Sequence, residues 1–121
     1  MKYEWLDAYL LSKTGVYKDF KEEWNWIRYL LNGKMIAAQC RDKTGKNIIT
    51  LKCDPLFGEK LRIRYDDVKP GYYMNKTHWN SVCLDGTVPD EILQEMIDQS
   101  YNLTFNKFSK KVQKEIRVSA E

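Results

Sequence analysis

Histidine and cysteine are the side chains of this sequence that could serve as nucleophiles, general bases or zinc ligands. His78 is the only histidine, and no glycine-serine-glycine elbow or activated cysteine accompanies it as a catalytic partner. The three cysteines, Cys40, Cys53 and Cys83, have no CxxC spacing, which argues against a disulfide framework and a zinc module. Each lies in an apolar run, so we expect reduced, buried thiols.

Phosphate cradles are also missing from the sequence. The six glycines are dispersed among turns and form neither G-x-x-x-x-G-K-[ST] nor G-x-G-x-x-G. Without an acid–base pair, a cofactor loop or a metal cluster, we expect a protein that is not an enzyme, with no catalytic residues, no metal and no cofactor.

Positive charge is concentrated in one part of the chain. The net charge is only +3, but residues 41–76 carry nine basic and five acidic side chains. Residues 77–99 carry five acidic side chains and no lysine or arginine. Such segregation can steer a charged partner, although a solvated helix face produces the same pattern.

Length and composition indicate one soluble domain. The chain has 121 residues, of which 43% are hydrophobic and 31% charged, as in ordinary globular proteins. The longest uncharged stretch has eight residues, far fewer than the roughly 18–20 that a membrane span needs. The N-terminal residues include the acidic Glu4 where a signal peptide would have an apolar core. We therefore expect a cytoplasmic protein without a membrane partner.

Hydrophobic periodicity and turn signals predict the order of the elements. Asn32-Gly33 suits a tight hairpin, and Asp54-Pro55 suits a helix start. Strands are expected at 16–20, 24–31, 35–41, 47–53 and 79–84, and helices over 2–13, from 54, from 89 and in the tail after 107. This order indicates an α+β domain with a single antiparallel β-sheet and helices packed on one face. The domain is expected to span residues 1–117, with residues 118–121 as a disordered tail.

Alternation along the strands predicts which side chains face the helices, because successive side chains point to opposite faces of a sheet. The helix-covered face is expected to hold Ile27, Tyr29, Leu31, Ile36, Ala38, Cys40, Ile49, Leu51 and Cys53. The uncovered face would then hold Trp24, Trp26, Arg28, Gln39, Arg41, Thr50 and Lys52. The uncovered face is thus both basic and aromatic.

Cations interleaved with aromatic rings are typical of nucleic-acid-binding surfaces, because cations contact phosphates and rings stack on exposed bases. The residues expected to bind nucleic acid are Arg28, Arg41, Lys52, Lys76, Trp24, Trp26 and Trp79. The alternative is a module that uses the same aromatic face for a protein or a small ligand, with a homodimer as one such arrangement. The sequence leaves both hypotheses open.

Three segments of the chain have an unusual composition: LKCDP from Leu51, KPGYYMNKTHWNSV from Lys69, and LDGTVPDEILQEMIDQSYNL from Leu84. Through them the chain resembles the MmcQ/YjbR family, small proteins proposed to bind DNA, over roughly residues 34–112. The resemblance implies a frataxin-like (CyaY-like) fold with projecting hairpins, called a double wing, that hold DNA. The family motif comprises Gly71, Tyr72, Met74, Asn75, Lys76, His78, Trp79 and Asn80.

The chain departs from the family pattern at a few positions. The family commonly has histidine where this chain has Tyr73 and a basic residue where it has Thr77. A Phe-Pro-Phe-Gly stretch is replaced here by residues 20–24. Frataxin-like folds can hold iron on a carboxylate ridge, but the first helix offers only Glu4 and Asp7, so we expect no iron site.

Overall fold

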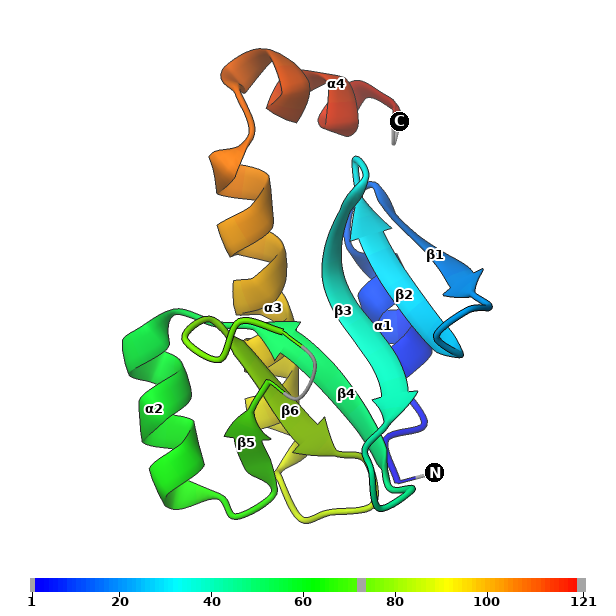
Figure 1. Cartoon of the computed structure of the whole chain (residues 1–121). Helices are drawn as coiled ribbons and strands as arrows, with labels where there is room; N and C mark the ends of the chain where they lie inside the picture. The colour runs from blue at the N-terminus through cyan, green and yellow to red at the C-terminus, as the bar shows by residue number, and fades with distance from the viewer. Residues whose placement is uncertain (1, 72–73, 120–121) are drawn as a thin grey trace.

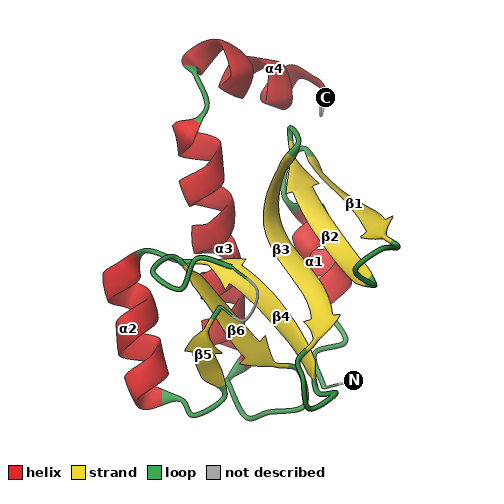
Figure 2. Ribbon diagram, viewed as in Figure 1, coloured by secondary structure: helices red, strands yellow, loops and turns green. Residues whose placement is uncertain are grey.

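The computed structural model describes residues 2–71 and 74–119, which form a six-stranded antiparallel sheet and four helices (Figures 1 and 2). The strands are β1 (Val16–Lys21), β2 (Trp26–Leu31), β3 (Lys34–Arg41), β4 (Asn47–Lys52), β5 (Val68–Pro70) and β6 (Trp79–Cys83). The helices are α1 (Leu6–Ser12), α2 (Pro55–Arg64), α3 (Asp90–Lys107) and α4 (Lys110–Ser119). The strand order is β1-β2-β3-β4-β6-β5, so the expected α+β class with a single antiparallel sheet is confirmed.

The helices α1 and α3 lie behind the sheet in Figure 1 and cover one of its faces. Leu93, Met96 and Ile97 of α3 are fully buried and belong to the same core cluster as Leu6 and Leu10 of α1. The helix α2 lies beside β5 and β6, at the edge of the sheet (Figure 1). The described part of the chain contains no helix with the length and apolar composition that crossing a lipid bilayer requires.

Local signals placed most elements correctly. Asn32 and Gly33 have φ angles of 47° and 82°, as a tight hairpin turn requires. The carboxylate of Asp54 caps α2 by accepting hydrogen bonds from two backbone N–H groups. The strand β5 is not among the strands that the sequence predicts. The helix α4 extends to Ser119, two residues beyond the predicted end of the domain.

A β-bulge in β3 alters the alternation of side chains. The register between β2 and β3 shifts between Tyr29 and Leu30, which leaves Ile36 as an extra residue in β3. Ile36 and Ala37 are consecutive, yet both are fully buried in the core cluster beneath the helices. After an extra residue, each following side chain of the strand points to the face opposite the one that unbroken alternation would give it.

The predicted orientation of Ala38, Cys40 and Gln39 is therefore wrong. Ala38 and Cys40 lie on the face opposite the helices, where Ala38 pairs with Thr50. Gln39 points the other way, and its Nε2 donates a hydrogen bond to the hydroxyl of Tyr29. The core cluster contains Tyr29, Leu31, Ile36, Ile49, Leu51 and Cys53, as predicted. The prediction of a buried Ile27 is wrong, because this side chain is 36% exposed and lies outside the cluster.

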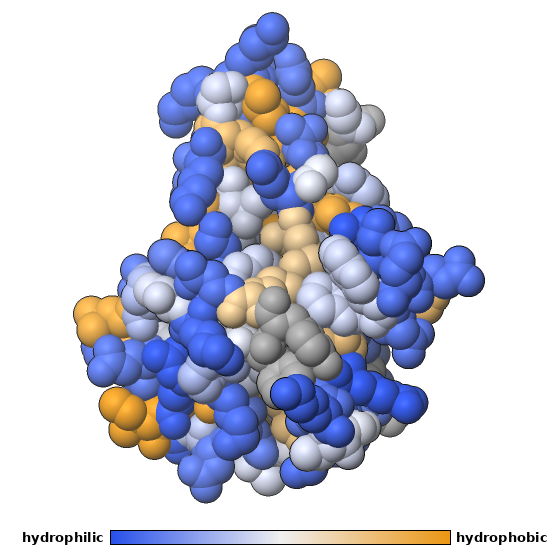
Figure 3. Space-filling model, viewed as in Figure 1, coloured by the Kyte–Doolittle hydropathy of each residue, from blue (hydrophilic) through white to orange (hydrophobic). Residues whose placement is uncertain are grey.

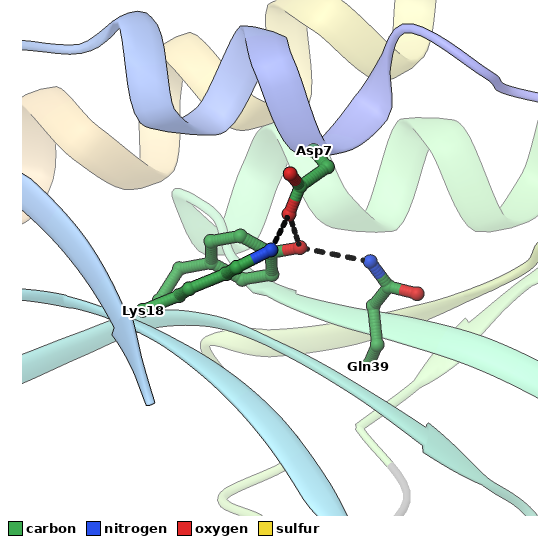
Figure 4. A network of polar contacts seen from close by, with 4 residues as sticks. Asp7, Lys18 and Gln39 are labelled. Atoms are coloured by element: carbon green, nitrogen blue, oxygen red, sulfur yellow. Dashed lines mark hydrogen bonds and ion pairs between the residues drawn. The ribbon is translucent and has the colours of Figure 1, made fainter. Parts of the chain in front are cut away.

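A polar network attaches α1 to the sheet (Figure 4). The Asp7 carboxylate accepts hydrogen bonds from Lys18 Nζ at 2.9 Å and from the Tyr29 hydroxyl at 2.8 Å. The Tyr29 hydroxyl in turn accepts from Gln39 Nε2 at 2.9 Å. These bonds favour the charged carboxylate and hold the pKa of Asp7 below its usual value, Lys18 being the largest cause and Tyr29 the next. One aspartate of α1 thus connects to β1, β2 and, through Tyr29, to β3.

Tyr29→Phe should destabilise the fold by about 1–2 kcal/mol, because it removes a buried hydroxyl that serves two hydrogen bonds and leaves Gln39 unsatisfied. Urea unfolding at neutral pH measures this loss. Tyr17→Phe, at an exposed tyrosine of β1, is the matched control and should change the free energy of unfolding by less than about 0.5 kcal/mol. Equal stabilities of the two variants would contradict a structural role for the network.

Stability should also depend on the charge of Asp7 in acid. Because the folded-state pKa of Asp7 lies below its unfolded value, its contribution is complete above the unfolded pKa, about 4, and is lost as pH falls through the folded pKa. Asp7→Asn should therefore lose less stability than the wild type between about pH 4 and pH 2.5. Parallel pH profiles for the two proteins would show that Asp7 is not involved.

Candidate functional site

The face of the sheet opposite α1 and α3 is a partly covered groove. Residues 74–78, which precede β6, pass in front of this face (Figure 1). Thr50 and Ser81, which share a hydrogen bond of 3.1 Å on this face, are only 1% and 5% exposed. Figure 3 shows a hollow near the middle of this side, with pale side chains on its floor and hydrophilic ones on both flanks. The sequence predicted an open surface, whereas only part of this face is accessible.

One end of the groove is an aromatic cavity of about 590 Å³. Its described lining residues are Trp24, Asn25, Trp26, Met35, Arg41 and Met74. The rings of Trp24 and Trp26 lie 5.1 Å apart with a tilt of 60°. Trp24 is 55% exposed, so these rings are not confined to the core. The structure therefore brings together three of the predicted site residues, Trp24, Trp26 and Arg41.

The turn between β1 and β2 positions Trp24. Asn25 has a φ angle of 57°, a left-handed conformation that asparagine tolerates better than most residues. The strand β2 consequently begins at Trp26, two residues later than predicted. Lys21 Nζ lies 5.4 Å from the centre of the Trp24 ring, a cation–π contact that favours the exposed position of the ring.

The other end of the groove is a basic cavity of about 460 Å³, at the end of β4 where α3 rises beyond the sheet (Figure 1). Its lining residues are Lys34, Met35, Lys52, Trp79, Thr104, Lys107 and Phe108. Burial lowers the pKa of Lys52, and the nearby amines of Lys107 and Lys34 lower it further. Lys52 and Trp79, both predicted site residues, thus meet here rather than beside Trp24.

Met35 lines both cavities, so they adjoin at the start of β3, and together they are called the groove. From Lys34 to Arg41 the strand extends roughly 23 Å, at about 3.3 Å per residue. The cations along this path are Lys34, Arg41, Lys52 and Lys107, and the described lining residues include no aspartate or glutamate. The groove is therefore positive along its length, while its floor and walls include apolar and aromatic side chains.

Two predicted cations do not line these cavities. Arg28 makes a double hydrogen bond with Asp19, from Nε at 2.8 Å and from Nη2 at 2.6 Å. This pairing lowers the pKa of Asp19, and it offsets the charge of the guanidinium. Lys76 Nζ donates to the carbonyl oxygen of Gly71 at 3.3 Å, so this amine is engaged within the segment between β5 and β6.

The family motif forms the scaffold that carries Met74 into the groove. The Gly71 N–H donates to the carbonyl of Trp79 at 2.6 Å, and a Cβ at Gly71 would lie 2.6 Å from the Cβ of Trp79. Asn75 accepts from the N–H of Thr77 through its side chain and from the N–H of Trp79 through its backbone.

The remaining motif residues also have structural contacts. The His78 carbonyl accepts from the N–H of Cys53 at 2.7 Å, and buried Asn80 accepts from Arg62. Tyr72 lies outside the described residues.

Two of the three cysteines, Cys40 and Cys53, are buried as expected, whereas Cys83 is partly exposed. Burial raises the pKa of Cys40 to about 11 and that of Cys53 to about 12, so neither thiol is ionised near neutral pH. No cluster of three or more histidine, cysteine or acidic side chains suited to a metal occurs among residues 2–71 and 74–119. The described lining residues of the two cavities offer cationic, aromatic and hydrogen-bonding side chains.

The sequence interpretation missed Lys34, Met35 and Lys107, which the structure places in the groove. Lys107 follows Ser100 and Thr104 at the spacing of one helix face, a pattern that could have been recognised. Lys34 could not be assigned in this way, because its position depends on the bulge two residues later.

Comparison with known proteins relates the chain to proteins of similar size. The family model YjbR matches residues 11–103. YyaQ of Bacillus subtilis is 40% identical over 118 residues, covering 78% of this chain and 99% of YyaQ. YjbR of Escherichia coli K12 is 29% identical over 98 residues, covering 81% and 82%. Both relatives are described as uncharacterized proteins.

Solved structures share the fold as well. A crystal structure of the Deinococcus radiodurans protein DR2400 superposes with a TM-score of 0.82 and 32% identity, covering 92% of this chain and 84% of that one. A Pseudomonas syringae protein superposes with a TM-score of 0.75 at 24% identity, covering 86% and 99%; at that identity it supports the fold alone.

Gly71→Ala should destabilise the protein by about 1–3 kcal/mol, because the new methyl group would force the chain away from Trp79. Thermal and urea unfolding measure the change. Thr77→Ala, an exposed position in the same motif, is the control and should stay within about 0.5 kcal/mol of wild type. A Gly71→Ala protein as stable as this control would show that the close approach is not required.

Proposed function

This chain belongs to the YjbR family, and we propose that it is a non-enzymatic protein that binds DNA along the groove. The observation that carries the proposal is the meeting, in two adjoining cavities, of tryptophans, thioethers and four cations without a lining carboxylate among the described residues. The resemblance to a family proposed to bind DNA supports the same function.

The groove suits single-stranded rather than double-stranded DNA. Stacking on a protein ring requires an unpaired base, and such stacking contributes about 1–3 kcal/mol per base. Trp24 and Trp26 offer two neighbouring rings at a cavity whose wall also contains Met74. In a duplex the bases are stacked on one another, so no base face is accessible for stacking on these rings. The four cations would then bind the phosphates that link the bases.

A small-ligand module is the second candidate. The aromatic cavity of about 590 Å³ falls in the size range of small-molecule sites, about 300–1,000 Å³. The exposed part of Trp24 would equally suit a protein partner or a second copy of the chain. These alternatives predict binding with little salt dependence, because their contacts would be chiefly apolar.

Affinity for a thymidine octamer should fall steeply with salt. Each phosphate contact with a single strand contributes about 0.7 to the slope of log affinity against log salt. The four groove cations predict a slope between about −1.4, if the three lysines share one phosphate, and about −2.8, if each cation contacts its own phosphate. Fluorescence anisotropy from 20 to 300 mM NaCl measures it, with a duplex of equal length for comparison. The proposed function is refuted if neither the octamer nor the duplex binds at the lowest salt.

Trp24→Ala should weaken binding of the octamer roughly 5- to 150-fold, as loss of one stacking platform predicts. Tyr17→Ala, at an exposed aromatic residue of β1 that does not line the groove, is the control and should change affinity less than about twofold. If Trp24→Ala binds DNA as tightly as the control does, the aromatic end is not the binding site. Sedimentation of both variants tests whether Trp24 instead holds a dimer.

A further inference from the structure

The basic end of the groove holds three lysines that come from three different elements. Lys34 begins β3, Lys52 ends β4, and Lys107 is the last residue of α3. All three line the same cavity of about 460 Å³. Within the described part of the chain, no carboxylate forms an ion pair with any of them.

Hydrogen bonds through Ser100 fix this convergence. The hydroxyl of Ser100 donates to the carbonyl of Ile36, the bulged residue of β3, at 2.6 Å. The same hydroxyl accepts from the N–H of Lys52 at 3.1 Å. Lys107 lies seven residues after Ser100, hence on the same side of α3. The end of β4, the bulge of β3 and one face of α3 are therefore held in a fixed relation.

Such a cluster is unfavourable without a counter-charge. The amines of Lys52 and Lys107 lie near each other, and like charges repel more strongly beside apolar walls than in water. The walls here include Met35, Trp79 and Phe108. The C-terminal end of α3 offsets part of the repulsion at Lys107, but a helix end amounts to only about half of a negative charge. An anion with several oxygen atoms would satisfy all three amines.

We propose that Lys34, Lys52 and Lys107 together bind one phosphate group at this end of the groove. The proposal deepens the proposed function, on which it rests for its biological context, by assigning the phosphate-binding step to these residues rather than to the aromatic end. Lysine amines bind phosphate as point charges on flexible stems, so three of them can approach one phosphate from different sides. The phosphate can be an internal group of a DNA strand or a free phosphate compound.

The test compares two phosphate sources on one set of proteins. Pyrophosphate represents the free compound, and the thymidine octamer represents the strand; calorimetry gives both affinities. Lys52→Met and Lys107→Met should each weaken binding about tenfold, the loss expected of one charge-assisted contact. Lys60→Met is the matched control, because Lys60 is an exposed lysine of α2 that lines neither groove cavity. It loses the same charge and should bind within about twofold of wild type.

A stability measurement separates binding from a structural role. If Lys107 repels its neighbours, Lys107→Met should unfold at the same temperature as wild type or higher when no phosphate compound is present. At one pyrophosphate concentration, the unfolding temperature should rise less for Lys107→Met than for wild type and Lys60→Met, as tenfold weaker binding predicts. A lower unfolding temperature for Lys107→Met without ligand would overturn the proposal, because it would make this lysine a structural contact.

The outcomes distinguish this proposal from the function on which it rests. If the octamer binds equally to the lysine variants and to Lys60→Met, the phosphate site is wrong and DNA binding stands. If pyrophosphate binds through the lysines and the octamer does not bind at all, the phosphate site is right and the proposed function is wrong. Pyrophosphate binding that ignores the lysine substitutions would refute the site.

Discussion

The packing of α3 against one face of the sheet is the contact on which the rest of the structure depends. Leu93, Met96 and Ile97 bury the apolar side of this helix against the sheet, and burial of such side chains contributes about 1.5–3 kcal/mol each. With that face covered, recognition can use only the opposite face and the end of the sheet beyond which α3 extends (Figure 1). The groove lies on the opposite face and at that end of the sheet, so the packing of α3 determines its position.

The bulge at Ile36 joins the core to the groove. The extra residue keeps Ile36 beside the helices and turns Ala38 and Cys40 to the opposite face. Its carbonyl accepts a hydrogen bond from Ser100, which places the start of β3 beside the C-terminal half of α3. One inserted residue thereby sets the phase of the strand and brings Lys34 close to the cavity at the end of α3. This is a case of a bulge that re-aims side chains next to a site.

Charge in this protein is balanced in some places and left unbalanced in others. Arg28 is paired with Asp19, and Lys18 with Asp7, so the cations of the β1–β2 hairpin and of the α1 network are compensated. The groove lysines Lys34, Lys52 and Lys107 have no acidic side chain among their described lining neighbours. Such a concentration of like charge costs stability and is consistent with an anionic occupant. Binding would then relieve a repulsion that folding imposes.

The sequence by itself determined the class of the fold, most of its elements and the family, because these depend on signals only a few residues long. Asn32-Gly33 specifies a turn, Asp54-Pro55 starts a helix, and the pattern after Pro89 requires a buried helix face. It also anticipated that Trp24, Trp26 and Arg41 share a surface. Only the tertiary structure decided that Arg28 is neutralised, that Gln39 faces α1, and that Lys34 and Lys107 join Lys52. Those outcomes depend on one extra residue in a strand and on contacts between residues far apart in the chain, and neither is encoded by local spacing.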